Sequence, residues 1–225
     1  MTKRKIKKFN LKKFLIFLIL FIVIAIILRI FLNMKLKNII VLNNSYYNDE
    51  EIIETAGLDN YPKFFLINKK KIVKKLKKLD LVEDVKVTKK YGCILEINVK
   101  EKKILYYDRS NNVYKVSDDN NYELNNIKGI PTLINYIPAD IAKKFVKEFM
   151  KIDSNVILLI NEIEYDKTAY DSERFLLTMN DGNTVYINIS RLHLLNKYID
   201  IVKKLDNKKG ILYLDSGNYF EIKEK

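Results

Sequence analysis

The sequence predicts an α+β protein that is held by one N-terminal transmembrane helix and carries two modules outside the membrane. Three observations lead to this expectation. A long apolar run follows a basic N-terminus, the next segment has the order strand, helix, helix, strand, strand, and the remainder places short strands and two helices between turn signals. With 225 residues, of which 48% are hydrophobic, the chain can bury one or two modest cores.

Residues 14–32, FLIFLILFIVIAIILRIFL, form a run of nineteen residues with a single charge, Arg29. At about 1.5 Å per residue such a helix is roughly 28 Å long, close to a hydrocarbon core of about 30 Å. Arg29 lies near one end, where its side chain can reach the headgroups. The segment after the run offers no pair of small residues for cleavage, so we expect an uncleaved anchor rather than a signal peptide or a buried soluble helix.

The distribution of charge predicts the orientation of this anchor. Residues 1–13 carry seven basic residues and no acid, whereas only Lys35 and Lys37 follow the run closely. The positive-inside rule therefore places a cytoplasmic basic tail, residues 1–13, inside the cell and the C-terminal part outside, in a single-pass protein of the cell membrane. The formal charge of +13 falls to +5 beyond Asn33 (33 basic against 28 acidic residues), so nucleic acid is not an expected partner.

Residues 34–102 predict a first external module. A short strand precedes a helix that Asn48 caps, with Glu51 three residues on and Gly57 closing it. Asn68 caps a second helix, and two strands joined by Tyr91-Gly92 follow. The lysines of the second helix lie off its apolar stripe, which favours a solvated face; contact with anionic lipid or wall polymer is the alternative.

Residues 103–225 predict a second module, a mixed α+β domain built on an antiparallel sheet. Its signals are two short strands around an Asn-Asn turn, a helix that begins at Pro138, and three strands of which the last two flank Asn-Asp-Gly-Asn. A helix over 191–205 follows, with Leu192, Leu195, Ile199 and Val202 on one face. Two terminal strands end the chain.

The last strand, in ILYLDSGNYFEIKEK, is expected at an edge of the sheet. An edge strand has unpaired N–H and C=O groups, which a binding protein can use to add a strand from a partner. The charged residues 223–225 blunt only its tip. Tyr219 and Phe220 point to opposite faces, so one can pack inward while the other serves a partner; both completing the core is the alternative.

Nothing in the sequence predicts an enzyme. The single histidine, His193, shares a helix face with charged residues, and the single cysteine, Cys93, opens a strand with no histidine to activate it. Asp118 and Asp119 fall in a turn, and there is no Gly-rich phosphate loop. We therefore expect no catalytic residue, no metal, no cofactor and no small-molecule substrate. A wall hydrolase would need a cleft with paired acids.

The ordered set of motifs resembles the FtsQ/DivIB family of bacterial division proteins. VLNN, EEIIETAGL, KKLKKLDLVEDVKV and LEINVKEK resemble the POTRA domain (β-α-α-β-β) of that family. The NEI strand, the hairpin around MNDGNTVYI and the final GI…D…G.YF pair resemble its second, β domain. The sequence departs from the pattern where Asp80 replaces a usual proline and Tyr91-Gly92 replaces Trp-Pro.

This resemblance implies a non-enzymatic divisome scaffold that works in septum formation at the division septum. In the family, the C-terminal edge recruits DivIC/FtsB-like and FtsL-like bitopic coiled-coil proteins by strand addition. Carried over by position, the partner-binding residues are Arg174, Leu214, Ser216, Gly217, Tyr219, Phe220 and Ile222. The alternative function is that of a POTRA-type component of polypeptide transport or secretion.

Overall fold

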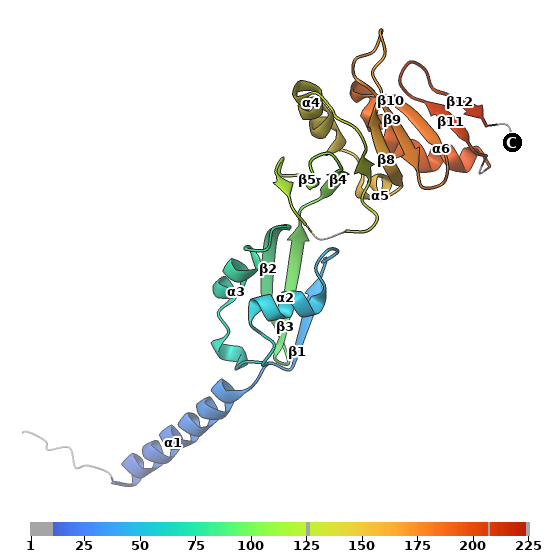
Figure 1. Cartoon of the computed structure of the whole chain (residues 1–225). Coiled ribbons are helices and arrows are strands. Elements are labelled where there is room, and N and C mark those ends of the chain that lie inside the picture. Colours follow the sequence, from blue (N-terminus) through green and yellow to red (C-terminus); the bar gives the residue numbers. More distant parts are fainter. Residues whose placement is uncertain (1–10, 125–126, 207, 224–225) are drawn as a thin grey trace, which may run out of the picture. The chain divides into compact units, whose positions relative to one another are not determined.

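The computed structural model describes residues 11–124, 127–206 and 208–223. Residues 1–10 of the predicted cytoplasmic tail and residues 224–225 of the predicted charged tip lie outside the described residues. The chain forms two compact units that meet in the sequence between Glu101 and Lys102 (Figure 1). We call the globular part of the first unit the first domain, and residues 102–225 the second domain.

Helix α1, Leu11–Asn33, contains the predicted membrane segment and has no buried residue. Among the described residues it is the one helix long and apolar enough to cross a membrane. It ends at Asn33, whose side-chain amide donates to the carbonyl of Arg29 over 2.8 Å and so satisfies a free carbonyl of the last turn. The helix is therefore slightly longer than the predicted apolar run.

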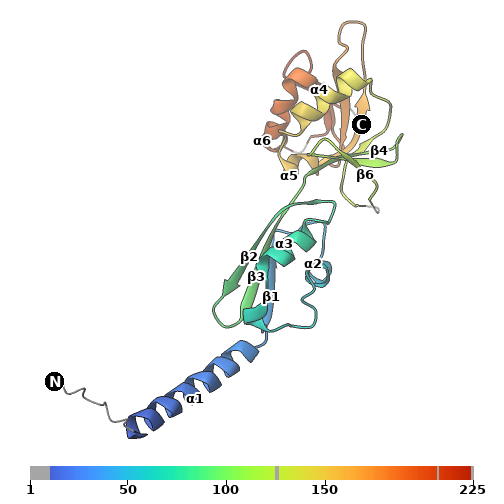
Figure 2. The ribbon, with the colours of Figure 1, turned by 90° about the vertical axis from the view of Figure 1, so that its left-hand side faces the viewer.

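The first domain has the predicted order, with one short 3₁₀ turn added. Its elements are β1 (Asn38–Leu42), α2 (Asp49–Ala56), η1 (Phe64–Leu66), α3 (Lys69–Leu76), β2 (Val82–Lys90) and β3 (Ile94–Glu101). The sheet order is β1-β3-β2, with β1 parallel and β2 antiparallel to the central β3. Residues of β3 alternate between buried and partly exposed, because α2 and α3 cover one face of the sheet (Figure 2).

The predicted helix caps of the first domain are confirmed. The side chain of Asn48 accepts from the backbone N–H of Glu51 over 2.8 Å, and Gly57 ends α2 with φ of 72°. Asn68 accepts from the N–H of Lys71 over 3.2 Å at the start of α3. Each helix is thus delimited by its own local sequence.

The second domain is built on one nine-stranded sheet. Its elements are β4 (Ile104–Asp108), β5 (Val113–Val116), β6 (Asn121–Tyr122), β7 (Thr132–Leu133), α4 (Ala139–Phe149), α5 (Ser154–Ile157), β8 (Ile160–Tyr165), β9 (Arg174–Met179), β10 (Thr184–Asn188), η2 (Ile189–Lys197), α6 (Tyr198–Lys204), β11 (Gly210–Tyr213) and β12 (Tyr219–Ile222). The order is β12-β11-β10-β9-β8-β7-β4-β5-β6. The β10/β11, β4/β7 and β7/β8 pairs are parallel and the other five antiparallel, so the predicted α+β class is confirmed.

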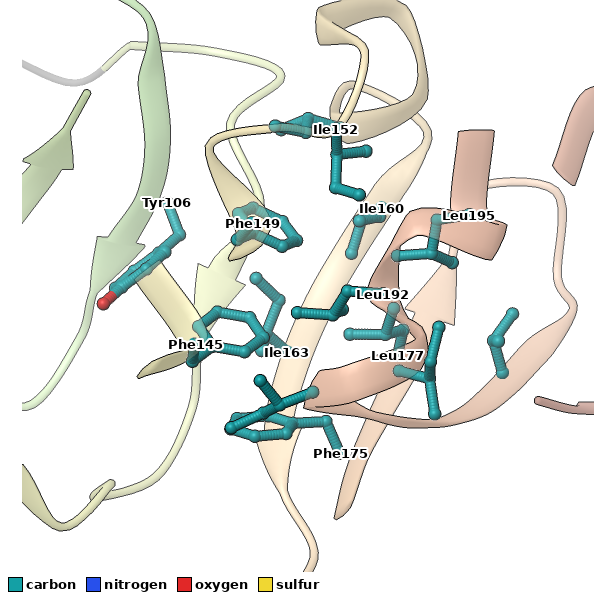
Figure 3. Close-up of a cluster of buried hydrophobic side chains, with 14 of the residues drawn as sticks. Tyr106, Phe145, Phe149, Ile152, Ile160, Ile163, Phe175, Leu177, Leu192 and Leu195 are labelled. Atoms are coloured by element: carbon teal, nitrogen blue, oxygen red, sulfur yellow. The ribbon is translucent and has the colours of Figure 1, made fainter. Parts of the chain in front are cut away.

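The helices of the second domain bury one face of the sheet (Figure 3). Phe145 of α4 lies at the centre, with its ring centroid 4.9 Å from that of Phe149 and 4.3 Å from that of Phe175 on β9. All three rings are fully buried. Because strand residues alternate, Arg174 and Leu176 point to the opposite face of the sheet.

The helix predicted over 191–205 differs in the structure. It begins as the 3₁₀ helix η2 and becomes α-helical only at Tyr198. A 3₁₀ helix aligns every third residue, so Leu192, Leu195 and Tyr198 are buried together, whereas Ile199 of the predicted stripe is exposed. His193 is exposed and Cys93 is a buried free thiol.

Candidate functional site at the C-terminal edge of the sheet

Strand β12 is the last strand of the nine-stranded sheet (Figure 1). It pairs with β11 along Tyr213↔Tyr219, Leu212↔Phe220, Ile211↔Glu221 and Gly210↔Ile222. No strand of the described residues pairs with its other side, which we call the C-terminal edge. An unpaired strand side of this kind is a template for a further strand.

The register decides which backbone groups of β12 point outward. The N–H of Lys223 donates to the carbonyl of Lys209 over 3.0 Å, so Ile222 belongs to a pair without mutual hydrogen bonds. Hydrogen-bonded and non-hydrogen-bonded pairs alternate along an antiparallel ladder, so Phe220 is in the same position as Ile222. The N–H and C=O groups of Phe220 and Ile222 are therefore directed away from β11.

The close approach of β12 to β11 requires glycine at position 210. A Cβ atom built there would collide with the backbone carbonyl oxygen of Glu221 and would lie 2.8 Å from the ring of Phe220. Gly217 in the preceding turn is constrained in a similar way, because its Cβ would lie 2.9 Å from the ring of Tyr219. Both glycines therefore contribute by the absence of a side chain.

Three stacked tyrosines cross the open face of the sheet toward the C-terminal edge. The rings of Tyr186 and Tyr213 lie 5.3 Å apart, and those of Tyr213 and Tyr219 lie 4.5 Å apart with an interplanar angle of 14°. The guanidinium carbon of Arg174 lies 4.0 Å from the ring centroid of Tyr186. We call these four residues the tyrosine ladder. It holds Tyr219 on the edge strand while leaving that residue 53% exposed.

Two arginines hold the turn between β11 and β12. Arg174 Nε lies 3.2 Å from Asp215 Oδ2, an ion pair without hydrogen-bond geometry, and its Nη2 lies 3.4 Å from Asp166 Oδ2. Arg191 donates to the carbonyl of Asp215 over 3.3 Å and to Asn218 Oδ1 over 2.7 Å. The turn is thus fixed from the sheet and from η2.

An apolar groove adjoins the edge on the helical face of the sheet. Its volume is about 420 Å³, and it is lined by Leu194, Lys197, Ile201, Leu205, Leu212, Leu214, Asn218, Tyr219 and Phe220. Phe220 packs against the core on this side. Ile222, at the end of the strand, remains 52% exposed. The edge therefore combines open backbone groups with exposed apolar side chains.

A buried amide fixes the start of β11. Asn183 is the one buried polar residue of the described chain; its Oδ1 accepts from the N–H of Gly210 over 2.9 Å, and its Nδ2 donates to the hydroxyl of Tyr198 over 3.1 Å. That hydroxyl donates to Asp181 over 2.8 Å. Burial, together with the Asp181 carboxylate, raises the pKa of the Tyr198 hydroxyl, so it remains a donor at neutral pH.

The structure brings the sequence-predicted residues together around β12 and the turn before it, which Arg174 reaches from β9. Leu214 is only 2% exposed and belongs to the core, so its side chain supports the strand and contributes to the lining of the groove. Ser216 is exposed, and its N–H donates to Asp215 Oδ1 over 2.7 Å. The side chain of Phe220 packs against the core, while its backbone N–H and C=O groups face away from β11.

Sequence reasoning missed several residues that shape this edge. These residues are Tyr186 on β10, Tyr213 on β11, Arg191 on η2 and Asn183 in the turn before β10. The parallel pairing of β10 with β11 brings the two tyrosines side by side. Two aromatic residues in short strands were the available signal. The register that stacks them cannot be read from either strand alone.

Known proteins are similar in sequence to both domains of this chain. Residues 34–102 match the family model "POTRA domain, FtsQ-type". The "Cell division protein DivIB" of Brevibacillus brevis is 26% identical over 218 residues, which are 92% of this chain and 83% of that protein. The protein of the same name from Bacillus subtilis is 27% identical over 83% of this chain and 74% of its own length, and that from Listeria monocytogenes is 28% identical over 83% and 72%.

Among solved structures, the chain is similar to the major extracytoplasmic domain of the cell division protein DivIB from Geobacillus stearothermophilus. The match has a TM-score of 0.38 at 19% sequence identity and covers 48% of this chain and 96% of that chain.

Proposed function

We propose that this chain, which carries a POTRA domain of the FtsQ type and is similar over most of its length to DivIB cell division proteins, is a membrane-anchored scaffold of cell division. In this proposal the protein binds other proteins and catalyses no reaction. Helix α1 holds it in the cell membrane with the N-terminus in the cytoplasm and both domains outside, at the division septum. The seven basic residues before the span support this orientation.

The observation that carries the proposal is the open backbone of β12. Phe220 and Ile222 direct their N–H and C=O groups away from β11, and no described strand pairs with them. A partner segment added there would extend the sheet by one strand. We propose that DivIC/FtsB-like and FtsL-like coiled-coil proteins, themselves anchored in the membrane, supply this segment.

Affinity in this mode comes from several modest terms. Each outward backbone group that is paired contributes about 0.5–1.5 kcal/mol net. The exposed side chains of Tyr219 and Ile222 add apolar contact, and the groove beside Phe220 can receive an apolar side chain of the partner. Because both proteins are anchored in one membrane, their effective concentration is high, so moderate affinity is sufficient.

Arg174 has a revised role within this proposal. Its guanidinium already faces Asp215 and Asp166, and its side chain is only 18% exposed. We propose that Arg174 positions the turn before β12 and supports Tyr186, and that an acidic partner residue would compete with Asp215 for it.

Deleting residues 217–225 from the full-length chain is expected to abolish capture of the DivIC-like and FtsL-like pair from detergent-solubilised membranes. The deletion removes β12 and with it the outward backbone groups. A pull-down with the tagged chain measures this, and the amount of chain in the membrane fraction reports insertion. Near-UV circular dichroism reports packing of the second domain.

A matched control is Tyr136→Ala, which alters an exposed aromatic residue in the loop before α4 and leaves the edge intact. This variant should capture the pair as the unaltered chain does. Undiminished capture by the deletion variant would refute the proposed edge, and recovery of unfolded polypeptides in place of division proteins would favour a transport component.

A further inference from the structure

The connection between the membrane helix and the first domain is very short. Helix α1 ends at Asn33, and Leu36 is already buried in the core of the first domain. The N–H of Leu36 donates to the carbonyl of Pro62 over 2.9 Å, and the N–H of Lys37 donates to that of Cys93 over 2.9 Å. Three residues span at most about 11 Å, whereas each headgroup layer is about 5–8 Å thick. This end of the first domain therefore cannot move far from the bilayer surface.

Two loops of the first domain lie at this end. The contacts of Lys37 place it beside the turn between β2 and β3, because β1 starts where β3 starts (Figure 1). The N–H of Phe64 in η1 donates to the carbonyl of Met34 over 2.9 Å. The rings of Phe31, in the last turns of α1, and Phe65 are stacked 3.8 Å apart. The chain thus joins η1 and the β2–β3 turn to the end of the membrane helix.

Both loops expose large apolar or aromatic side chains. Tyr91, at the tip of the β2–β3 turn, is fully exposed, and Leu66 in η1 is 67% exposed. Tyr61, just before η1, is also exposed. Exposure of apolar side chains to water is unfavourable. Tyrosine is enriched at membrane–water interfaces because it combines an apolar ring with a polar hydroxyl.

Cations surround these side chains. The lysines of this end are Lys35, Lys37, Lys63, Lys69, Lys89 and Lys90, of which Lys90 is paired with Glu96 over 3.2 Å. Lys89 donates to the carbonyl of Phe65 over 3.2 Å, and burial together with the charge of Lys69 lowers its pKa. At the opposite end of the domain the first turn of α2 carries Asp49, Glu50 and Glu51, and Glu101 accepts the N–H groups of Ser45 and Tyr46. The lysines at that end include Lys77 and Lys100, which are paired with Asp84 and Glu83. Acidic side chains therefore gather at the end of the first domain that is remote from α1.

We propose that this end of the first domain, defined by Tyr61, Leu66, Tyr91 and the six lysines, is a membrane-docking surface. It rests on the leaflet from which α1 emerges, with Tyr91 and Leu66 in the headgroup region and the lysines beside the phosphates of anionic phospholipids. A lipid surface is the occupant because the short connection from Asn33 already holds the surface within reach of the headgroups. Docking would orient the first domain relative to the membrane, in addition to tethering it. The inference depends on α1 spanning a membrane and is independent of the partner edge.

A single tryptophan can test this proposal, because the chain contains none. The full-length variant Tyr91→Trp is reconstituted in nanodiscs of phosphatidylcholine, with or without phosphatidylglycerol. We expect its emission to shift to shorter wavelength when the anionic lipid is present, and brominated acyl chains to quench it, because aromatic side chains at the membrane interface lie beside the acyl chains. The matched control is Tyr170→Trp, which replaces an equally exposed tyrosine of the second domain.

The control emission should be the same with and without anionic or brominated lipid. Identical behaviour of the two variants would overturn the docking surface. In the Tyr91→Trp background, Lys63→Glu with Lys69→Glu should remove the dependence on anionic lipid, whereas Lys78→Glu, beyond the far end of α3, should keep it. Equal quenching without anionic lipid would overturn the role of the lysines. Partner capture is measured separately, so either proposal can fail alone.

Discussion

Replacing Ile222 by proline is expected to weaken capture of the DivIC-like and FtsL-like pair by more than about tenfold, since loss of one outward hydrogen bond and steric exclusion by the ring together exceed about 1.4 kcal/mol. Proline has no N–H, and its ring occupies the place where an added strand would lie. The N–H of Ile222 makes no bond to β11, so the ladder inside the protein remains. Quantitative pull-down or surface binding of the purified partner measures the effect.

Ile222→Thr is the matched control for this substitution. Threonine keeps the backbone N–H and a branched side chain suited to a strand, so it should retain most of the capture. The two variants should also unfold at nearly the same denaturant concentration, because Ile222 is exposed. Equal binding by both variants would mean that the backbone of β12 takes no part, and equal loss by both would assign the binding to the side chain.

Replacing Phe145 by alanine is expected to destabilise the second domain by about 3–5 kcal/mol, the range for removing a fully buried aromatic side chain. Phe145 contacts the rings of Phe149 and Phe175 and so joins α4 to the sheet (Figure 3). Such a loss is a large part of the stability of a typical domain. Urea unfolding followed by far-UV circular dichroism measures it, and partner capture should fall as the folded fraction falls.

Lys143→Ala, on the exposed side of the same helix, is the control and should change the stability by less than about 0.5 kcal/mol. The two variants together also test whether the domains are independent. Because the first domain has its own core, centred on Leu95 and Ile97, its unfolding transition should be unchanged by Phe145→Ala. A parallel shift of both transitions would show that the two units fold as one.

The elements that could be predicted from the sequence are those whose signals are local. Asn48, Asn68 and Gly57 act within one turn of the helix that each delimits, so their spacing is sufficient. The membrane helix is evident because a long apolar run has few alternatives. The 3₁₀ start of η2 was missed because Leu192 and Leu195 fit a period of 3.6 as well as one of 3.0.

The missed elements depend on distant parts of the chain. Strand β7 has two residues, Thr132 and Leu133, and exists only because β4 and β8 lie on either side of it. Helix α5 is a single turn that no pattern of apolar residues announces. Strands β10 and β11 can pair in parallel because η2 and α6, which lie between them in the sequence, form the crossover connection.

The sequence predicted the strand that carries the candidate site, but not the register or the tertiary contacts of that strand. The terminal strand could be recognised from its alternation, and the opposed directions of Tyr219 and Phe220 follow from strand geometry. Which backbone groups point outward depends on the register with β11, which the bond from Lys223 to Lys209 reveals. The burial of Leu214 and the ion pair of Arg174 with Asp215 are tertiary facts that no local pattern encodes.

Hydrogen exchange at the backbone amides of β12 tests the central claim most directly. In the free protein, the amides of Phe220 and Ile222 should exchange quickly while that of Glu221, bonded to β11, is protected. Binding of the DivIC-like partner should slow exchange at Phe220 and Ile222 and leave Glu221 little changed. Amides of Phe220 and Ile222 that are already protected without a partner, or that stay fast in the complex, would contradict strand addition at this edge.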